Sequence, residues 1–348
     1  MTRDMPPFAT LAIGSFPFTE ARLALDLMEG RVDIPASPQL VRLSPWEDML
    51  LGAADGIYFV EPDSESRTLR VPLAGREESL ARFYEAFYAG DFSFLERSGR
   101  AAGGWGAFLE RARQSPAFGE AFLKTQVVGP LTFGQSVKVE GAFSLVDDPG
   151  LLEAAACALG AKAGREAFAI RELGRSAVAF LDEPGLSGYG SAFSTLSADT
   201  VLRALGAAAE AARAQGPVLV GLHVCGNTDW GLMAKADIDI LNCDSYGYIE
   251  SVALYPKEIQ AFLERGGRVA WGLVPAQGFE ASMQAAFLGE RLAAGLEGLA
   301  GHGVDRGLLS SRSLLTSSCG LGSLSEGLAS RVVELLPAVQ AEMRRRFP

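Results

Sequence analysis

A short apolar strand, a loop bearing glycine or proline, and an alanine- and leucine-rich helix recur along these 348 residues. Near-continuous apolar strands that alternate with amphipathic helices indicate a parallel sheet covered by helices. The expected strands are residues 11–13, 125–128, 177–181, 217–222, 238–242 and 269–274, with apolar pairs at 308–309 and 314–315 near the end. The expected helices are residues 20–28, 198–215, 284–299 and 325–346.

The length and the number of these units favour a (β/α)8 TIM barrel, an α/β fold, over an open doubly wound sheet. Residues 32–76 are richer in polar residues and turns, and they fit the rhythm less well. We therefore predict one TIM-barrel domain over residues 1–348, in which this N-terminal segment elaborates the first connection between strand and helix.

Composition excludes several classes of protein. The chain is 48% hydrophobic and 21% charged, an ordinary globular mixture. Its net charge is −11 and the only concentrated basic run is residues 344–346, so we expect no nucleic-acid partner. No stretch reaches the apolar length of a membrane span, and the first residues lack the pattern of a signal peptide, so we expect no membrane association and a cytoplasmic location.

His223 and Cys225 are separated by one residue at the end of a predicted strand. Residues i and i+2 of a strand point to the same side, so the imidazole and the thiol should emerge together. These two groups suit Zn²⁺, although a buried cysteine beside a structural histidine would show the same pattern. The four cysteines of the chain are too few for a disulfide framework, which leaves thiols free for a metal.

Further ligands are expected at the same end of the barrel. Cys319 lies in a loop of small residues after a late strand, which would deliver it to the same mouth. Asp244 follows the strand after His223 and is a candidate carboxylate ligand, with its neighbour Cys243 packed outward. The reverse assignment, with Cys243 as the ligand, stays open at this point. Cys157 falls in a helical pattern and is expected in the core.

Zn²⁺ held by two thiolates and an imidazole keeps one exchangeable position. A thiol that enters this position loses its proton, because the metal favours the thiolate, and it stays nucleophilic at neutral pH. Soft sulfur ligands lower the Lewis acidity available to activate water. The predicted donor set therefore favours alkylation of a thiol over hydrolysis.

Four ordered motifs resemble the catalytic domain of cobalamin-independent methionine synthase. They are the IGSFP run at residues 13–17, the DEPGL run at 182–186, the HVC run at 223–225 and the CGL run at 319–321. The HVCGNT run at 223–228 is also similar to methylcobalamin:coenzyme M methyltransferases. Both groups belong with uroporphyrinogen decarboxylase in one TIM-barrel superfamily, and the resemblance spans about residues 11–321.

The resemblance implies residue roles. His223, Cys225, Cys319 and Asp244 would be the zinc ligands, Asp244 standing where the family has a glutamate. The carboxylate of a homocysteine substrate would be held by the turn that contains Ile13, Gly14 and Ser15. Asp182 would be the catalytic carboxylate that takes the α-ammonium group, with Glu183 beside it in the substrate site. A second carboxylate that the family places in the first third of the chain has no clear counterpart.

Two departures bear on the methyl donor. The family's histidine on a late strand loop is missing from residues 271–276, and we expect His302 to be structural. The family's extra N-terminal half, which contributes to folate handling, is also not matched. Methyl-tetrahydrofolate needs a general acid because its amine leaves poorly, whereas a methyl-corrinoid releases cob(I)alamin without one. The prediction is therefore a methyl-corrinoid donor, with a corrinoid protein as a possible partner, as in core-only members of the family.

Other functions stay open at this point. The methylated thiol could be another small thiol of the coenzyme M kind. A lyase of the uroporphyrinogen decarboxylase type would need arginines that meet many carboxylates, and no arginine cluster stands near the early strand ends. A non-catalytic zinc- or corrinoid-binding protein is the third alternative.

Overall fold

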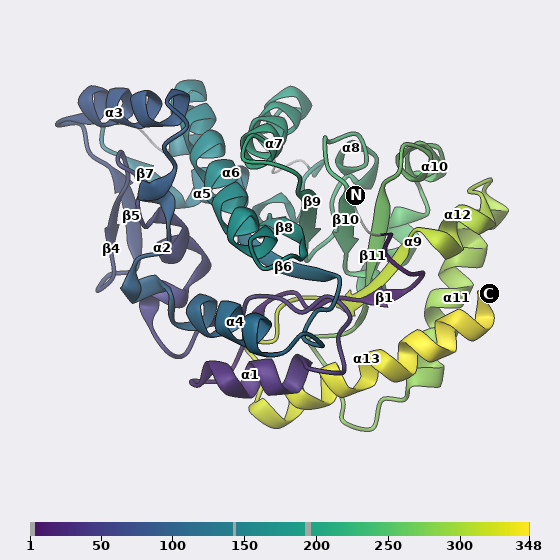
Figure 1. The fold of residues 1–348 in the computed structure, drawn as a ribbon. Helices are drawn as coiled ribbons and strands as arrows, with labels where there is room; N and C mark the ends of the chain where they lie inside the picture. The colour runs from purple at the N-terminus through teal and green to yellow at the C-terminus, as the bar shows by residue number, and fades with distance from the viewer. Residues whose placement is uncertain (1–3, 142–143, 192–195, 348) are drawn as a thin grey trace.

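Seven parallel strands form a curled sheet at the centre of the molecule (Figure 1). The structure is a computed structural model that describes residues 4–141, 144–191 and 196–347. In their order across the sheet the strands are β1 (Ala9–Thr10), β12 (Ser313–Ser317), β11 (Arg268–Val274), β10 (Ile240–Cys243), β9 (Leu219–Val224), β8 (Ser176–Asp182) and β6 (Phe122–Val128).

Residues 34–37 join the two edges of this sheet. The Ile34 amide donates to Thr10 O at 2.9 Å on one side, and the Ser37 amide donates to Lys124 O at 2.8 Å on the other. Both bridges are parallel, so this segment is the eighth strand of a closed barrel. The predicted TIM-barrel fold is confirmed, but the first residues of segment 32–76 belong to the barrel and not to the elaboration. Pro35 and Pro38 interrupt the apolar run by which a strand is usually recognised.

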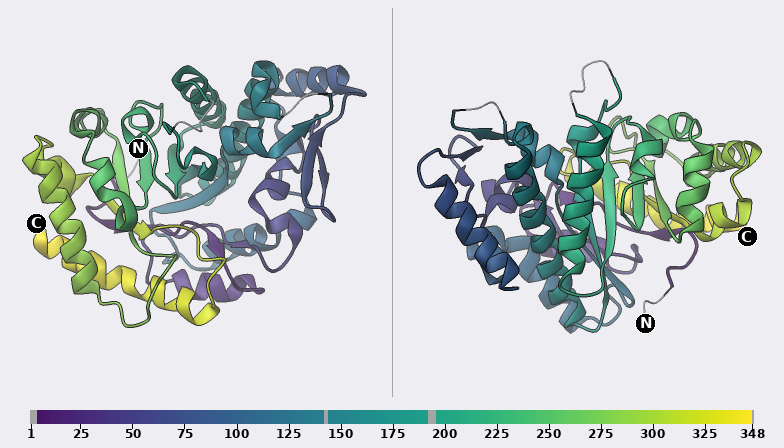
Figure 2. Two further views of the ribbon diagram at one scale, coloured as in Figure 1. Left: turned by 180° about the vertical axis from the view of Figure 1, so that it is seen from behind. Right: turned by 90° about the horizontal axis from the view of Figure 1, so that it is seen from above.

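Helices cover the outside of the barrel (Figures 1 and 2). They are α1 (Ala21–Met28), α6 (Pro149–Arg171), α7 (Ala198–Arg213), α8 (Trp230–Met233), α9 (Ser245–Val252), α10 (Pro256–Glu264), α11 (Ala285–Gly301), α12 (Arg306–Ser311) and α13 (Glu326–Arg346). The four predicted helices are α1, α7, α11 and α13. Of the two apolar pairs, residues 314–315 lie in β12, whereas residues 308–309 lie in α12, because Asp305 caps that helix at the Leu308 amide, 2.7 Å away.

A second layer of structure stands to one side of the barrel (Figures 1 and 2). It contains β4 (Glu61–Asp63), β5 (Thr68–Val71), β7 (Val137–Val139), α2 (Met49–Ala54) and α3 (Arg76–Tyr88). The remaining elements are β2 (Ser15–Phe16) and β3 (Gln39–Leu40), which pair with each other, α4 (Gly103–Gln114), which packs beside α1, and α5 (Pro130–Ser136), which leads from β6 to β7. Strand β7 pairs with β5 although it follows β6 in the chain. The elaboration therefore continues well past residue 76, the predicted end, and draws on two barrel connections.

The interior of the barrel is apolar toward the amino ends of the strands and polar toward their carboxyl ends. Its buried apolar cluster comprises Met5, Ala9, Leu11, Ile34, Phe122, Val178, Phe180, Ile240, Ala270 and Leu314. The buried polar groups above it include Lys124, Gln126, Asp182, His223 and Asn242. Among the described residues, no helix is long and apolar enough to span a membrane.

Candidate metal and thiol site

Three predicted ligands meet at the carboxyl-terminal mouth of the barrel. His223 lies in β9, Cys225 follows that strand, and Cys319 follows β12, three places away in the sheet. Their donor atoms all lie within 4.8 Å of one another. A tetrahedral zinc ion would hold two thiolate sulfurs about 3.8 Å apart, so a small contraction of this cluster fits the ion.

Asn242 fixes the imidazole of His223. The two residues are register partners on β10 and β9, and Asn242 Oδ1 lies 2.5 Å from His223 Nδ1. Asn242 Nδ2 donates to Ala270 O at 2.7 Å, which leaves Oδ1 as the acceptor. His223 therefore carries its proton on Nδ1, and Nε2 is free to bind a metal. The sequence analysis did not identify Asn242. The available sign was a polar amide residue within an otherwise apolar strand, and alignment of this strand with β9 places that residue opposite His223.

Replacing Asn242 with leucine is expected to lower zinc affinity about 10- to 100-fold, the usual effect of losing the partner that orients a metal-binding histidine. The measurement is competition for Zn²⁺ with a chromophoric chelator. Asn227→Ala is the matched control, because that side chain is exposed and lies on the loop after β9 that carries Cys225. Equal zinc affinity in Asn242→Leu and the wild type would remove the assigned role.

The two thiols of the cluster differ in acidity. A hydrogen bond from the Cys319 thiol and a second interaction with His223 lower the pKa of Cys225 to about 4. The same contact with Cys225, together with burial, raises the pKa of Cys319 well above its usual value. The cluster therefore holds one thiolate readily, and a second negative ligand forms when a cation replaces the shared proton.

Asp182 ends β8 beside His223 and lacks a partner for one oxygen. Its side chain is 7% exposed, and Oδ1 has no hydrogen bond among the described residues. Burial raises the pKa of Asp182, whereas the charges of Lys124 and His223 act in the opposite direction. A buried carboxylate oxygen with no donor is costly, so the site is suited to a cationic ligand group.

Glu183, the next residue, faces the first turn of α5. It accepts hydrogen bonds from Leu131 N at 2.9 Å, from Thr132 N at 2.7 Å and from the Thr132 hydroxyl at 2.5 Å. Burial raises the pKa of Glu183 to about 7. Both oxygens are thus engaged in holding a helix, and the predicted contact between Glu183 and a substrate stays a prediction.

Gly129 makes room for this carboxylate. A Cβ atom on Gly129 would lie 2.3 Å from Glu183 Cδ, so Gly129→Ala is expected to destabilise the fold by about 1–3 kcal/mol through overpacking. Gly206→Ala is the control: the position is helical and open, so alanine should stabilise by up to about 1 kcal/mol. Urea unfolding of both variants tests the opposite signs, and equal shifts would contradict the packing argument.

The turn at Gly14 and Ser15 packs against the loop of Cys319. The Leu321 amide donates to Ser15 O at 2.8 Å, and the Ser15 hydroxyl donates to Gln39 Oε1 at 3.2 Å. Gln39 is 7% exposed and follows the eighth barrel segment. Sequence reasoning missed Gln39, because the strand that precedes it was assigned to the elaboration.

Asp244 stands at the edge of the cluster. It caps α9 by accepting from Gly247 N at 2.9 Å, and it is near enough to Cys225 and His223 to interact with their charges. It is not in the group of donor atoms that lie within 4.8 Å, so its role as a ligand stays a prediction. Cys243 is fully buried in the core outside the barrel, and Cys157 is half-buried on α6 against the same core.

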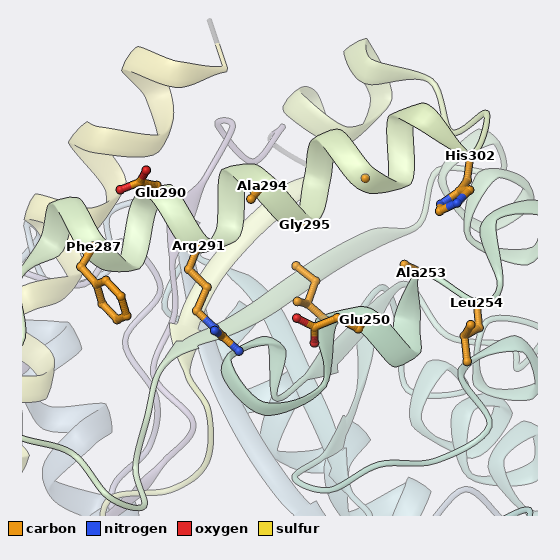
Figure 3. Close-up of a pocket in the computed structure, with 11 residues that line it drawn as sticks. Glu250, Ala253, Leu254, Phe287, Glu290, Arg291, Ala294, Gly295 and His302 are labelled. Carbon is orange, nitrogen blue, oxygen red and sulfur yellow. The ribbon is translucent and has the colours of Figure 1, made fainter.

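His302 lies far from this arrangement in the fold, at the end of α11. It lines one end of a groove of about 600 Å³ between α9 and α11, on the outside of the barrel (Figure 3). The floor of the groove includes Ile249 and Gly295, and none of its lining residues belongs to the cluster at the mouth. After β11, the Ala276 amide donates to Ser318 Oγ at 2.9 Å.

Comparison with known proteins gives a similarity of fold. No family model matches the chain, and no curated protein matches it. Its structure is similar to that of a B12-independent methionine synthase from Shewanella sp. W3-18-1 in complex with selenomethionine, with a TM-score of 0.60 over 97% of this chain and 98% of that chain. The two sequences are 16% identical, so this likeness shows the fold alone.

Proposed function

We propose that this protein is a zinc-dependent methyltransferase that moves a methyl group from a methyl-corrinoid to the sulfur of homocysteine, forming methionine. The observation that carries the proposal is the meeting of His223, Cys225 and Cys319 within 4.8 Å at the barrel mouth. Two cysteines and a histidine with no fourth protein donor in this group leave a coordination position for a substrate.

Zinc and the residues around it would have separate roles in activating the substrate thiol. When bound, zinc supplies a position at which the substrate thiol loses its proton and is held as a nucleophile. By binding Nδ1, Asn242 leaves Nε2 of His223 free for the metal. Cys225 is ionised at neutral pH, since its pKa is about 4, and so attracts the cation before Cys319 gives up its proton.

The amino-acid end of homocysteine would be bound at two neighbouring strand ends. Asp182 Oδ1, which has no hydrogen-bond partner among the described residues, would accept from the α-ammonium group. The turn of Ile13, Gly14 and Ser15 would offer backbone N–H groups and a hydroxyl to the carboxylate. Orientation by both charged groups would hold the sulfur at the metal and in line with the methyl donor.

A corrinoid donor fits the groups available at the mouth. A methyl-corrinoid would supply a methyl group whose bonding electron pair stays on cobalt when the substrate sulfur takes the methyl carbon, so the chain would need no proton donor for the leaving group. The chain has two histidines, of which His223 is in the cluster and His302 is outside the barrel. A folate donor would need a general acid at its leaving nitrogen. A protein that carries the corrinoid is the corresponding partner in this proposal.

A second candidate acceptor is a small thiol without an amino-acid group, favoured by the HVCGNT run at residues 223–228. Purified protein should be incubated with methylcobalamin and either homocysteine or coenzyme M. Methionine formation that requires zinc supports the main proposal. Methylation of coenzyme M alone would move the proposal to the second candidate.

The same preparation separates the other classes of function. A zinc content near zero after gentle purification would contradict the metal proposal and favour a metal-free lyase. Zinc near one per chain, without turnover and with an X-ray absorption spectrum unchanged by added thiol, would indicate a binding protein instead of an enzyme.

A further inference from the structure

Lys124 is a buried cation beneath the site, and the mechanism above does not use it. Its side chain is fully buried inside the barrel on β6. Its Nζ donates to Ile13 O at 2.6 Å and to Gln126 Oε1 at 3.0 Å, and it lies 4.4 Å from the centre of the Phe180 ring. Lysine is almost never fully buried unless it is paired, so this placement calls for a reason.

The contact with Ile13 determines where the next amide points. The peptide bond between Ile13 and Gly14 is trans, and in a trans peptide the carbonyl and the following N–H point in opposite directions. Lys124 bonds the Ile13 carbonyl from the barrel interior, so the N–H of Gly14 is directed away from that interior. A cation on the carbonyl also polarises the peptide and makes this N–H a stronger donor.

Gln126 completes the support of the turn. Its Nε2 donates to Ser37 O at 2.7 Å while its Oε1 accepts from Lys124. Gly14 has a φ of +136°, and a Cβ atom there would lie 2.5 Å from the Gln126 amide. The turn therefore packs directly against Lys124 and Gln126, and no side chain fits between Gly14 and Gln126. Its backbone conformation also requires glycine.

Lys124 and Asp182 also balance each other's charge. Burial lowers the pKa of Lys124 to about 8, and the carboxylate of Asp182 acts against this shift. The lysine is therefore mainly protonated at neutral pH. With one buried cation behind the turn and one buried anion at the next strand end, the pocket offers one charge of each sign.

We propose that Lys124 is a positioning residue that fits this site to a zwitterionic thiol: it holds the turn by the Ile13 carbonyl, directs the Gly14 N–H at a substrate carboxylate, and sets a positive charge opposite Asp182. This inference rests on the proposed function for the identity of the thiol site. It adds Lys124 to the residues that select for homocysteine, so that a thiol with only one of the two charged groups binds poorly.

Three thiols with the same three carbons between the sulfur and the charged groups test the inference: homocysteine, 3-mercaptopropylamine, which lacks the carboxylate, and 4-mercaptobutyrate, which lacks the ammonium. Their binding to the zinc-loaded protein is measured by calorimetry without a methyl donor. We expect the wild type to bind homocysteine about 10- to 100-fold more tightly than either analogue, the value of a hydrogen bond to a charged group.

Lys124→Met should weaken binding of homocysteine and of 4-mercaptobutyrate about 10- to 100-fold while leaving 3-mercaptopropylamine unchanged or tighter. Lys162→Met is the matched control. Lys162 is also buried, bonds a backbone carbonyl (Asp55 O, 2.6 Å) and has a pKa lowered to about 8, but it lies on α6 outside the barrel. Its variant should keep the wild-type order of the three thiols.

Equal weakening of all three thiols in Lys124→Met would reduce Lys124 to a structural residue and overturn the inference. If that variant does not fold, the wild type decides: equal affinity for homocysteine and 3-mercaptopropylamine overturns the inference, and a tenfold preference for homocysteine supports it. Selective binding without methyl transfer would overturn the proposed function alone. If none of the thiols binds, both are overturned.

Discussion

Cys319→Ser is expected to leave the protein with less than about a tenth of a zinc ion per chain and to lower methyl transfer at least about 1,000-fold. Zinc binding by small protein sites is worth about 10–16 kcal/mol at pH 7, so losing one of three ligands costs several kcal/mol. The substrate thiol would also lose the site at which it is deprotonated. Elemental analysis after dialysis against a weak chelator, together with an assay of homocysteine methylation, measures both effects.

Cys157→Ser is the control for this substitution. Cys157 is a half-buried cysteine on α6, outside the cluster, so its variant should keep one zinc and full activity. A chelator should lower the melting temperature of the wild type and of Cys157→Ser, because zinc binds the folded state, but not that of Cys319→Ser. A Cys319→Ser protein that retains zinc and activity would show that the cluster is not the metal site.

Asp182→Asn is expected to raise KM for homocysteine about 100-fold or more while kcat changes much less, because a buried charge pair with the substrate ammonium is lost. The melting temperature should stay the same or rise. Burial raises the pKa of Asp182 and Oδ1 lacks a donor, so in the absence of substrate this burial cost exceeds the gain from the facing charge of Lys124. Steady-state kinetics and thermal unfolding of the same preparation test both statements.

Glu183→Gln is the contrasting variant one residue away. It should lower stability by about 1–3 kcal/mol, because an amide cannot accept from all three donors of α5. Folding raises the pKa of Glu183 from 4.5 to about 7, so its contribution to stability is present at low pH and is lost as the pH rises through 7. That part of the pH dependence should disappear in the variant. A large KM effect for Glu183→Gln and none for Asp182→Asn would reverse the two roles.

The site could be predicted to the extent that it lies in short motifs. His223 and Cys225 share one strand end, so the alternation of side chains along a strand already places them together. Cys319 was predicted from its position after a late strand, which requires only that parallel strands end at one mouth. Asp182 and the turn at Gly14 were predicted by resemblance to a family.

The supporting residues could not be predicted in the same way. Asn242 contacts His223 because β9 and β10 are aligned in a particular register, and a shift of one residue would turn the amide to the other face. Gln39 reaches Ser15 only because residues 34–37 close the barrel. Pro35 and the adjacent Pro38 interrupt the apolar pattern of this strand while its backbone pairing is kept, so the sequence does not reveal it.

The sequence by itself determined the α/β repeat, the four helices with clear amphipathic patterns, and the chemistry of the His223 and Cys225 pair. These depend on periodicity and on neighbours in the chain. The tertiary structure decided which atoms face one another across the barrel. It brought Cys319 close to Cys225 and bonded Lys124 to the Ile13 carbonyl. It also engaged Glu183 in hydrogen bonds with α5, while Asp182 Oδ1 kept no partner among the described residues. The physical reason is that closing a barrel fixes contacts between distant strands, and no local pattern encodes their register.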